Sequence, residues 1–162
     1  MDMHTELIER IDDLAPHERK NVAAALQELL ATCHDATLGY VEAAKDAKDP
    51  ELSHLLSSCA LEHEEAGNAI AKMLLEMNVE PHVTHSFGGE IHRRLIALRS
   101  SIGHGEAASL LPECERGEHV AISRYEKALS LKLPIPIADT LLDLATACRE
   151  RRAAFDRMRH PW

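Results

Sequence analysis

The chain has 162 residues, of which 45% are hydrophobic and 3% aromatic. This length fits one domain with a sizeable core, and the abundance of alanine and leucine with few aromatic residues favours helices over strands. The formal net charge of −9 argues against nucleic acid or an anionic membrane surface as a partner. No apolar run is long enough to cross a bilayer and no leader pattern opens the chain, so we expect a cytoplasmic protein.

The first residues are expected to form an N-terminal helical extension over residues 1–16. Leu7, Ile8, Ile11 and Leu14 have the spacing of one helical face, which predicts a short preliminary helix. This helix could supply an interface or cap the bundle that we expect over residues 17–160.

Two long helices joined by a short connection come next. From residue 22 to residue 47, apolar residues alternate at spacings of four and three, as on one face of a helix. Asp49 is a predicted N-cap and Pro50 suits the first helical position, so a second helix begins there and ends before Pro81. The two helices should form an antiparallel hairpin.

Three further helices are predicted after a loop over residues 80–89. A short crossover helix covers residues 91–102 and ends at two glycines. A long helix follows over residues 111–129, with Pro112 in its first turn or at a kink, and the last helix covers residues 137–158. The four long stripes have an average period of 3.5 residues, which is typical of a four-helix bundle. The sequence therefore predicts an all-α, ferritin-like four-helix bundle with a short crossover helix.

Three polar residues interrupt the apolar stripes near the middle of the predicted bundle: His63, Glu118 and Arg151. A buried charge without a partner costs several kcal/mol, so we expect these side chains to bond to one another in a polar core layer. The main interpretation is a structural ion-pair network that determines how the helices align.

A metal site is the alternative interpretation of the same layer. Ferritin-type sites take one carboxylate from each of two helices and a Glu-x-x-His pair from each of the others. Candidate ligands for a single iron or manganese ion are Glu62, His63, Glu65, Glu115, Glu118 and His119. The required histidines are missing from the carboxylate pairs, and Asp35 and Glu42 are expected to point outward. A dinuclear centre is therefore disfavoured, and no catalytic residues are identified.

Other core positions have simpler interpretations. One cysteine falls on the stripe of each long helix, and small buried hydrophobes are the expected role of Cys33, Cys59, Cys114 and Cys148. Tyr40 and Tyr125 are expected to pack in the core with one satisfied hydroxyl each. The five arginines between residues 149 and 159 are expected to pair with the neighbouring acidic helix.

Several segments resemble a known family. The string from Glu113 to Glu118 that leads to Tyr125, together with residues 30–35 and 48–52, resembles ferritin-like four-helix-bundle proteins of unknown function that are widespread in proteobacteria. The resemblance covers residues 20–160 and implies a bacterial cytoplasmic protein with a ferritin-like bundle. It implies no settled activity. Phe155 stands where the resemblance would place a histidine, which disfavours a metal site.

Three functional hypotheses follow. The first is a non-enzymatic module that acts by self-association, as a dimer, or by binding a protein partner, with a role in stress physiology suggested by the distribution of the family. The second is an oxidase or storage protein that binds iron or manganese through the mid-bundle carboxylates. The third and weakest is a small-molecule or haem-type ligand in the core.

Overall fold

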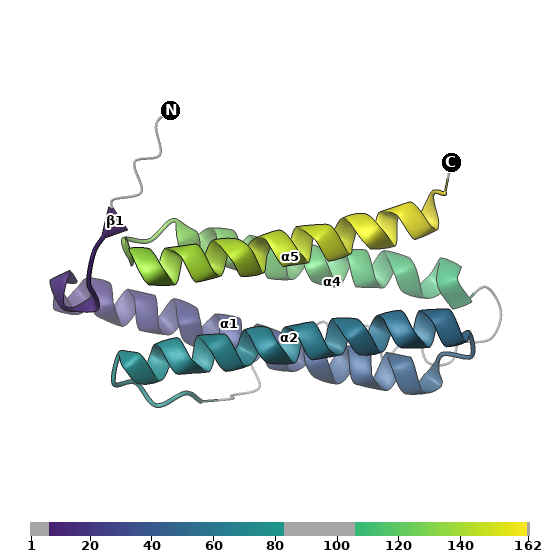
Figure 1. Ribbon diagram of the computed structural model, residues 1–162, viewed down its shortest axis with the longest axis horizontal. Helices are drawn as coiled ribbons and strands as arrows, with labels where there is room; N and C mark the ends of the chain where they lie inside the picture. Colours follow the sequence, from purple (N-terminus) through teal and green to yellow (C-terminus); the bar gives the residue numbers. More distant parts are fainter. Residues whose placement is uncertain (1–6, 83–105, 162) are drawn as a thin grey trace.

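Four long helices form the molecule in the computed structural model, which describes residues 7–82 and 106–161. They are α1 (Pro16–Asp46), α2 (Pro50–Glu76), α4 (Glu106–Leu129) and α5 (Ile135–Arg159). They lie in two layers, with α1 beside α2 and α4 beside α5 (Figure 1). In this view α2 and α4 run in one direction, and α1 and α5 run in the other. The all-α prediction is confirmed, whereas the predicted crossover helix over 91–102 lies outside the described residues.

The hairpin of α1 and α2 is as the sequence predicts. The Asp49 carboxylate accepts a hydrogen bond of 2.9 Å from the Glu51 N–H, and Pro50 is the first residue of α2. The N-cap prediction is therefore confirmed. Later in the chain, α4 begins before the predicted position, so Pro112 lies inside the helix rather than in its first turn.

The predicted preliminary helix is wrong. Leu7–Ile8 forms strand β1, which pairs in parallel with strand β2 (Leu133–Pro134), and Ile11–Asp13 makes a short 3-10 turn. So short a segment forms too few intrahelical hydrogen bonds to offset the cost of nucleating a helix. The extended connection between α4 and α5 offers backbone partners instead. Leu14 closes this end of the core and is buried.

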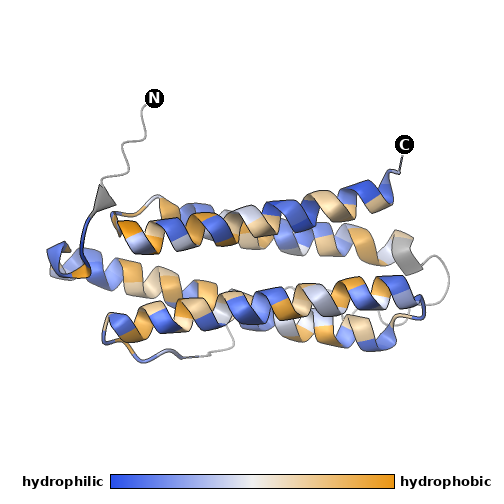
Figure 2. Ribbon diagram, in the orientation of Figure 1, coloured by the Kyte–Doolittle hydropathy of each residue, from blue (hydrophilic) through white to orange (hydrophobic). Residues whose placement is uncertain are grey.

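The core consists of two hydrophobic clusters that follow one another along the bundle. One contains residues such as Leu26, Ile70 and Leu141, and the other contains Leu56 and Leu110. Hydrophobic and hydrophilic residues alternate along each helix, as its apolar stripe requires (Figure 2). No helix in the described ranges is both long and apolar enough to span a membrane.

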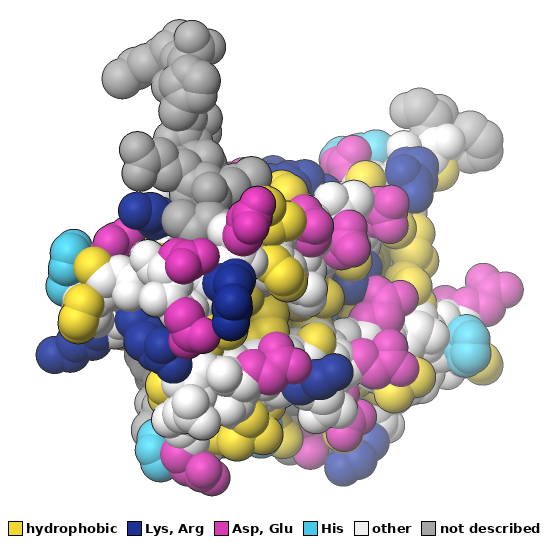
Figure 3. All heavy atoms as spheres, turned by 60° about the vertical axis from the view of Figure 1, so that its left-hand side comes forward, with side chains coloured by type: hydrophobic (Ala, Val, Ile, Leu, Met, Phe, Trp, Pro, Cys, Tyr) yellow, Lys and Arg dark blue, Asp and Glu magenta, His cyan; other side chains and the backbone are white. Residues whose placement is uncertain are grey.

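Between and beside these clusters, five polar or charged residues of the described part are buried: Thr32, Asp35, His63, Glu118 and Arg151. The expectation that Asp35 points outward is wrong. Because α1 packs against both α2 and α4, a wide sector of its surface is covered, and Asp35 falls within that sector. Elsewhere, acidic and basic side chains are mixed on the surface, as on the face drawn in Figure 3.

Candidate functional site

Glu118 on α4 lies at the centre of a polar layer to which all four long helices contribute. Its Oε1 atom accepts hydrogen bonds from the Tyr40 hydroxyl at 2.8 Å and from Nε of Arg151 at 3.2 Å. Nε2 of His63 lies 2.9 Å from the same oxygen. Tyr40 belongs to α1, His63 to α2 and Arg151 to α5. One carboxylate oxygen therefore joins four helices.

Arg151 extends this layer toward the surface. One terminal nitrogen of its guanidinium lies 2.5 Å from Oε2 of Glu62, whose side chain is 52% exposed. The other donates to Sγ of Cys148 at 3.1 Å. Arg151 itself is only 9% exposed. The guanidinium thus links a fully buried carboxylate to a half-exposed one.

His63 and Glu118 each stabilise the charged form of the other. Burial alone would lower the pKa of His63, but the adjacent Glu118 carboxylate raises it to about 9. Burial alone would raise the pKa of Glu118, but His63 and Arg151 lower it to about 2. At neutral pH the layer therefore contains an imidazolium and a guanidinium on one carboxylate.

The thiols around this layer are inert as nucleophiles. Cys59 and Cys114 each lie one helical turn before a member of the His63–Glu118 pair. Burial, with the negative charge of Glu118, raises the pKa of the Cys59 thiol to about 12 and raises that of Cys114 well above its usual value. All four cysteines are free and buried, which confirms their prediction as small core residues.

Aromatic rings complete the packing around the layer. The Tyr40 ring stacks on His63 with a centroid distance of 5.6 Å, and on Phe155 at 6.3 Å. The Tyr125 hydroxyl lies 3.5 Å from Sγ of Cys33. Both tyrosines are therefore packed core residues with one polar contact, as predicted. Phe155 contributes a hydrophobic ring where a metal ligand would need a donor atom.

The six candidate metal ligands do not form one site. His63 and Glu118 meet in the core, but Glu65 and His119 are exposed, and Glu115 pairs with Arg159 at 2.9 Å. Neighbouring residues on a helix, such as Glu62 and His63, point in directions about 100° apart, so they cannot all face one ion. Among the described residues, no group of three or more His, Cys, Asp or Glu could hold a metal ion.

A dinuclear centre of the ferritin type does not fit the residues of this layer either. Oε2 of Glu118 is buried and accepts no hydrogen bond from any described residue. A single free carboxylate oxygen is too few donors for an ion, and the remaining core partners of Glu118 are two cations and a hydroxyl.

Sequence reasoning missed two members of the layer. Tyr40 lies on the predicted core stripe of α1, but only its position opposite Glu118 makes its hydroxyl a donor there. Glu62 was considered as a metal ligand and not as the second partner of Arg151.

The predicted cross-helix pairing of arginines occurs for Arg149, whose guanidinium lies 3.0 Å from Glu126.

Comparison with known protein families matches the chain to a family model. A family model described as "Domain of unknown function (DUF2383)" matches residues 21–131, which is more than half of the chain. No curated protein matches the sequence.

Proposed function

The chain belongs to the DUF2383 family, a domain of unknown function, and we propose that it is a non-enzymatic, ferritin-like bundle that acts by self-association. In this proposal the central layer stabilises the bundle and performs no chemistry. The observation that carries it is the geometry at Glu118, where a histidine, an arginine and a tyrosine already share one of the two carboxylate oxygens.

Helix direction supports the ferritin-like part of the proposal. α2 and α4 run the same way, so the last residue of α2 and the first residue of α4 lie at opposite ends of the bundle (Figure 1). This order of directions is typical of ferritin-like folds, whereas helices that follow one another in simple up-and-down bundles alternate in direction.

The guanidinium of Arg151 supports the absence of a resident metal. It supplies a permanent positive charge between Glu118 and Glu62, the two carboxylates that reach the layer from α4 and α2. A divalent cation at this position would lie beside the guanidinium and the imidazolium, and both repel it. Arg151 thus neutralises the carboxylates in place of an ion.

Elemental analysis tests this part of the proposal. The full chain is expressed in medium supplemented with iron and manganese, together with Glu118→Gln and Glu115→Gln as a control carboxylate on the outer face. We expect far less than one ion per chain in all three proteins. Stoichiometric iron or manganese that is retained by the wild type and by Glu115→Gln, but lost from Glu118→Gln, would establish the metal-binding oxidase or storage alternative.

An apolar surface on the outer side of α1 and α2 supports self-association. Val41 and Ala60 line a shallow groove of about 340 Å³ between these helices. Leu38 lies one turn from Val41, and Leu61, which is 55% exposed, follows Ala60, so both flank the groove. Exposed apolar side chains gathered in this way are typical of interaction surfaces, and symmetric dimers are the commonest assembly.

Size-exclusion chromatography with light scattering tests the dimer. Leu61→Ser should convert it to monomers, because it replaces the most exposed apolar side chain beside the groove with a polar one. Leu142→Ser is the matched control, since Leu142 is 50% exposed but lies on α5. A wild-type chain that is monomeric at micromolar concentration, or a dimer unaffected by Leu61→Ser, would contradict self-association through this surface.

A further inference from the structure

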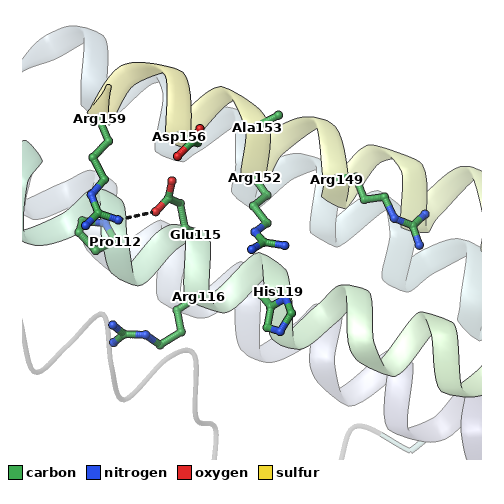
Figure 4. Close-up of a pocket in the computed structure, with 9 residues that line it drawn as sticks. All are labelled: Pro112, Glu115, Arg116, His119, Arg149, Arg152, Ala153, Asp156 and Arg159. Carbon is green, nitrogen blue, oxygen red and sulfur yellow. Dashed lines mark hydrogen bonds and ion pairs between the residues drawn. The ribbon is translucent and has the colours of Figure 1, made fainter. Parts of the chain in front are cut away.

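A groove between α4 and α5 contains an unusual concentration of arginine. It has a volume of about 640 Å³, within the usual range of ligand sites, and lies on the side of the bundle formed by these two helices. Its lining residues are Pro112, Glu115, Arg116, His119, Arg149, Arg152, Ala153, Asp156 and Arg159. Figure 4 shows Arg159, Arg152 and Arg149 following one another along α5, and Arg152 extending toward His119 on α4.

The groove is positively charged within an acidic protein. Four arginines line it against two carboxylates, whereas the whole chain has a formal net charge of −9. This differs from the face drawn in Figure 3, where side chains of both signs are mixed. An anion that enters the groove therefore meets more cationic than anionic side chains in its lining.

Three of the four arginines in the groove have partners, and only Arg152 has none among the described residues. Arg116 pairs with Glu113 on its own helix. Arg159 pairs with Glu115, and Arg149 pairs with Glu126 just beyond the groove. The guanidinium of Arg152 makes no hydrogen bond or ion pair with any residue that the structure describes, and the same holds for the imidazole of His119. Arg152 and His119 thus line the groove from opposite walls, and no described residue accepts a hydrogen bond from either side chain.

The fold gives no reason for this arrangement. Arg152 is exposed and contributes to neither hydrophobic cluster. Arg149 lies one turn before it with the same charge, and Asp156 lies one turn after it but makes no ion pair with it. The ion pairs at the ends involve partly exposed arginines and contribute little to stability, so an incoming anion can displace or share them at little cost. We propose that the α4–α5 groove binds a small phosphate-bearing anion with more than one phosphate group.

Phosphate matches the geometry better than carboxylate. Donors come from both walls, with Arg149 and Arg152 on α5 and Arg116 and His119 on α4. A tetrahedral phosphate presents oxygens to both walls at once, whereas a planar carboxylate suits one guanidinium fork. Arg149 and Arg159 are ten residues apart, about 15 Å along the helix, which exceeds one phosphate. Among the described residues, no Phe, Tyr or Trp lines the groove, so its donors are set against the phosphates of a ligand and not against a large apolar ring.

Isothermal titration calorimetry with the full chain tests this site, with inorganic tripolyphosphate as the probe and citrate as the carboxylate comparison, at low ionic strength. The test variant is Arg152→Gln. The matched control is Arg157→Gln, because Arg157 is also an exposed arginine of α5 that makes no hydrogen bond or ion pair with a described residue, but it does not line the groove. Both variants change the net charge by the same amount, and circular dichroism verifies that they fold.

Saturable binding of tripolyphosphate is expected, with an affinity that falls about tenfold in Arg152→Gln and stays unchanged in Arg157→Gln. Equal loss in the two variants would overturn the proposal, since it would mean that only net charge matters. No saturable binding by the wild type, or tighter binding of citrate than of tripolyphosphate, would overturn it as well. The proposed self-association involves another face, so its failure would leave this result unaffected.

Discussion

The ion pair between His63 and Glu118 should make the stability of the bundle depend on pH. His63 has a pKa of about 9 in the folded chain against 6.5 for an unperturbed histidine. Because the pKa is higher in the folded chain, protonation of His63 stabilises the fold. The stabilisation is fully present below pH 6.5 and is lost as the pH rises through 9. Between pH 6.5 and pH 9 the folded chain therefore binds one proton more than the unfolded chain.

The magnitude follows from these two pKa values. At about 1.4 kcal/mol per unit of pKa difference, protonation of His63 contributes about 3 kcal/mol to the free energy of unfolding. The lowered pKa of Glu118, about 2, reports the same interaction from the acidic side, where stability is lost as the pH falls from 4.5 through 2. The two contributions are therefore not added.

Urea unfolding followed by circular dichroism, in the presence of a reductant, measures the effect. The wild type is compared with His63→Gln, in which the amide can still donate to Glu118 but does not titrate. The stability advantage of the wild type should shrink by about 3 kcal/mol between pH 6 and pH 9, with a slope near −1.4 kcal/mol per pH unit. Parallel curves for the two proteins across this range would refute the reasoning, because His63 would then not be the group that titrates.

Three further predictions concern other residues of the core. Arg151→Met should lower the free energy of unfolding by about 3 kcal/mol, because it removes a buried partner of Glu118. It should also raise the pKa of His63, which the guanidinium lowers, and an NMR titration that shows no rise would contradict this. The Cys59 thiol should react with a thiol reagent only as fast as the chain unfolds, because burial raises its pKa to about 12; rapid labelling in native buffer would disprove it. Gly67→Val should destabilise the chain by about 1–3 kcal/mol, since a Cβ at Gly67 already lies 3.3 Å from that of Cys33, and an unchanged midpoint in urea would show that α1 can move away.

Much of the candidate site could be predicted because burial of charge leaves few choices. His63, Glu118 and Arg151 occupy positions where the apolar period requires a core residue, and a charge there must have a partner. What the pattern could not supply is the identity of each partner. The long side chain of Arg151 contacts both Glu118 and Glu62. Which carboxylates it contacts depends on its rotamer and on how far the helices are shifted along their axes relative to one another.

The α4–α5 groove was harder to predict for a related reason. Arg149, Arg152 and Arg159 are all exposed residues of one helix, and their spacing is the same whether they pair with carboxylates or not. Only the position of α4 decides that Arg159 meets Glu115 while Arg152 meets no acceptor among the described residues.

The sequence by itself determined the helices and their buried faces, because hydrogen bonding, capping at Asp49 and the alternation of apolar residues act within a few turns of chain. The tertiary structure alone decided that Leu7–Ile8 is a strand, that Asp35 is covered, and that Tyr40 and Glu62 join the central layer. These outcomes depend on what a distant segment places opposite each residue. A repeat along one helix specifies which face is buried, but not which atoms lie across from it.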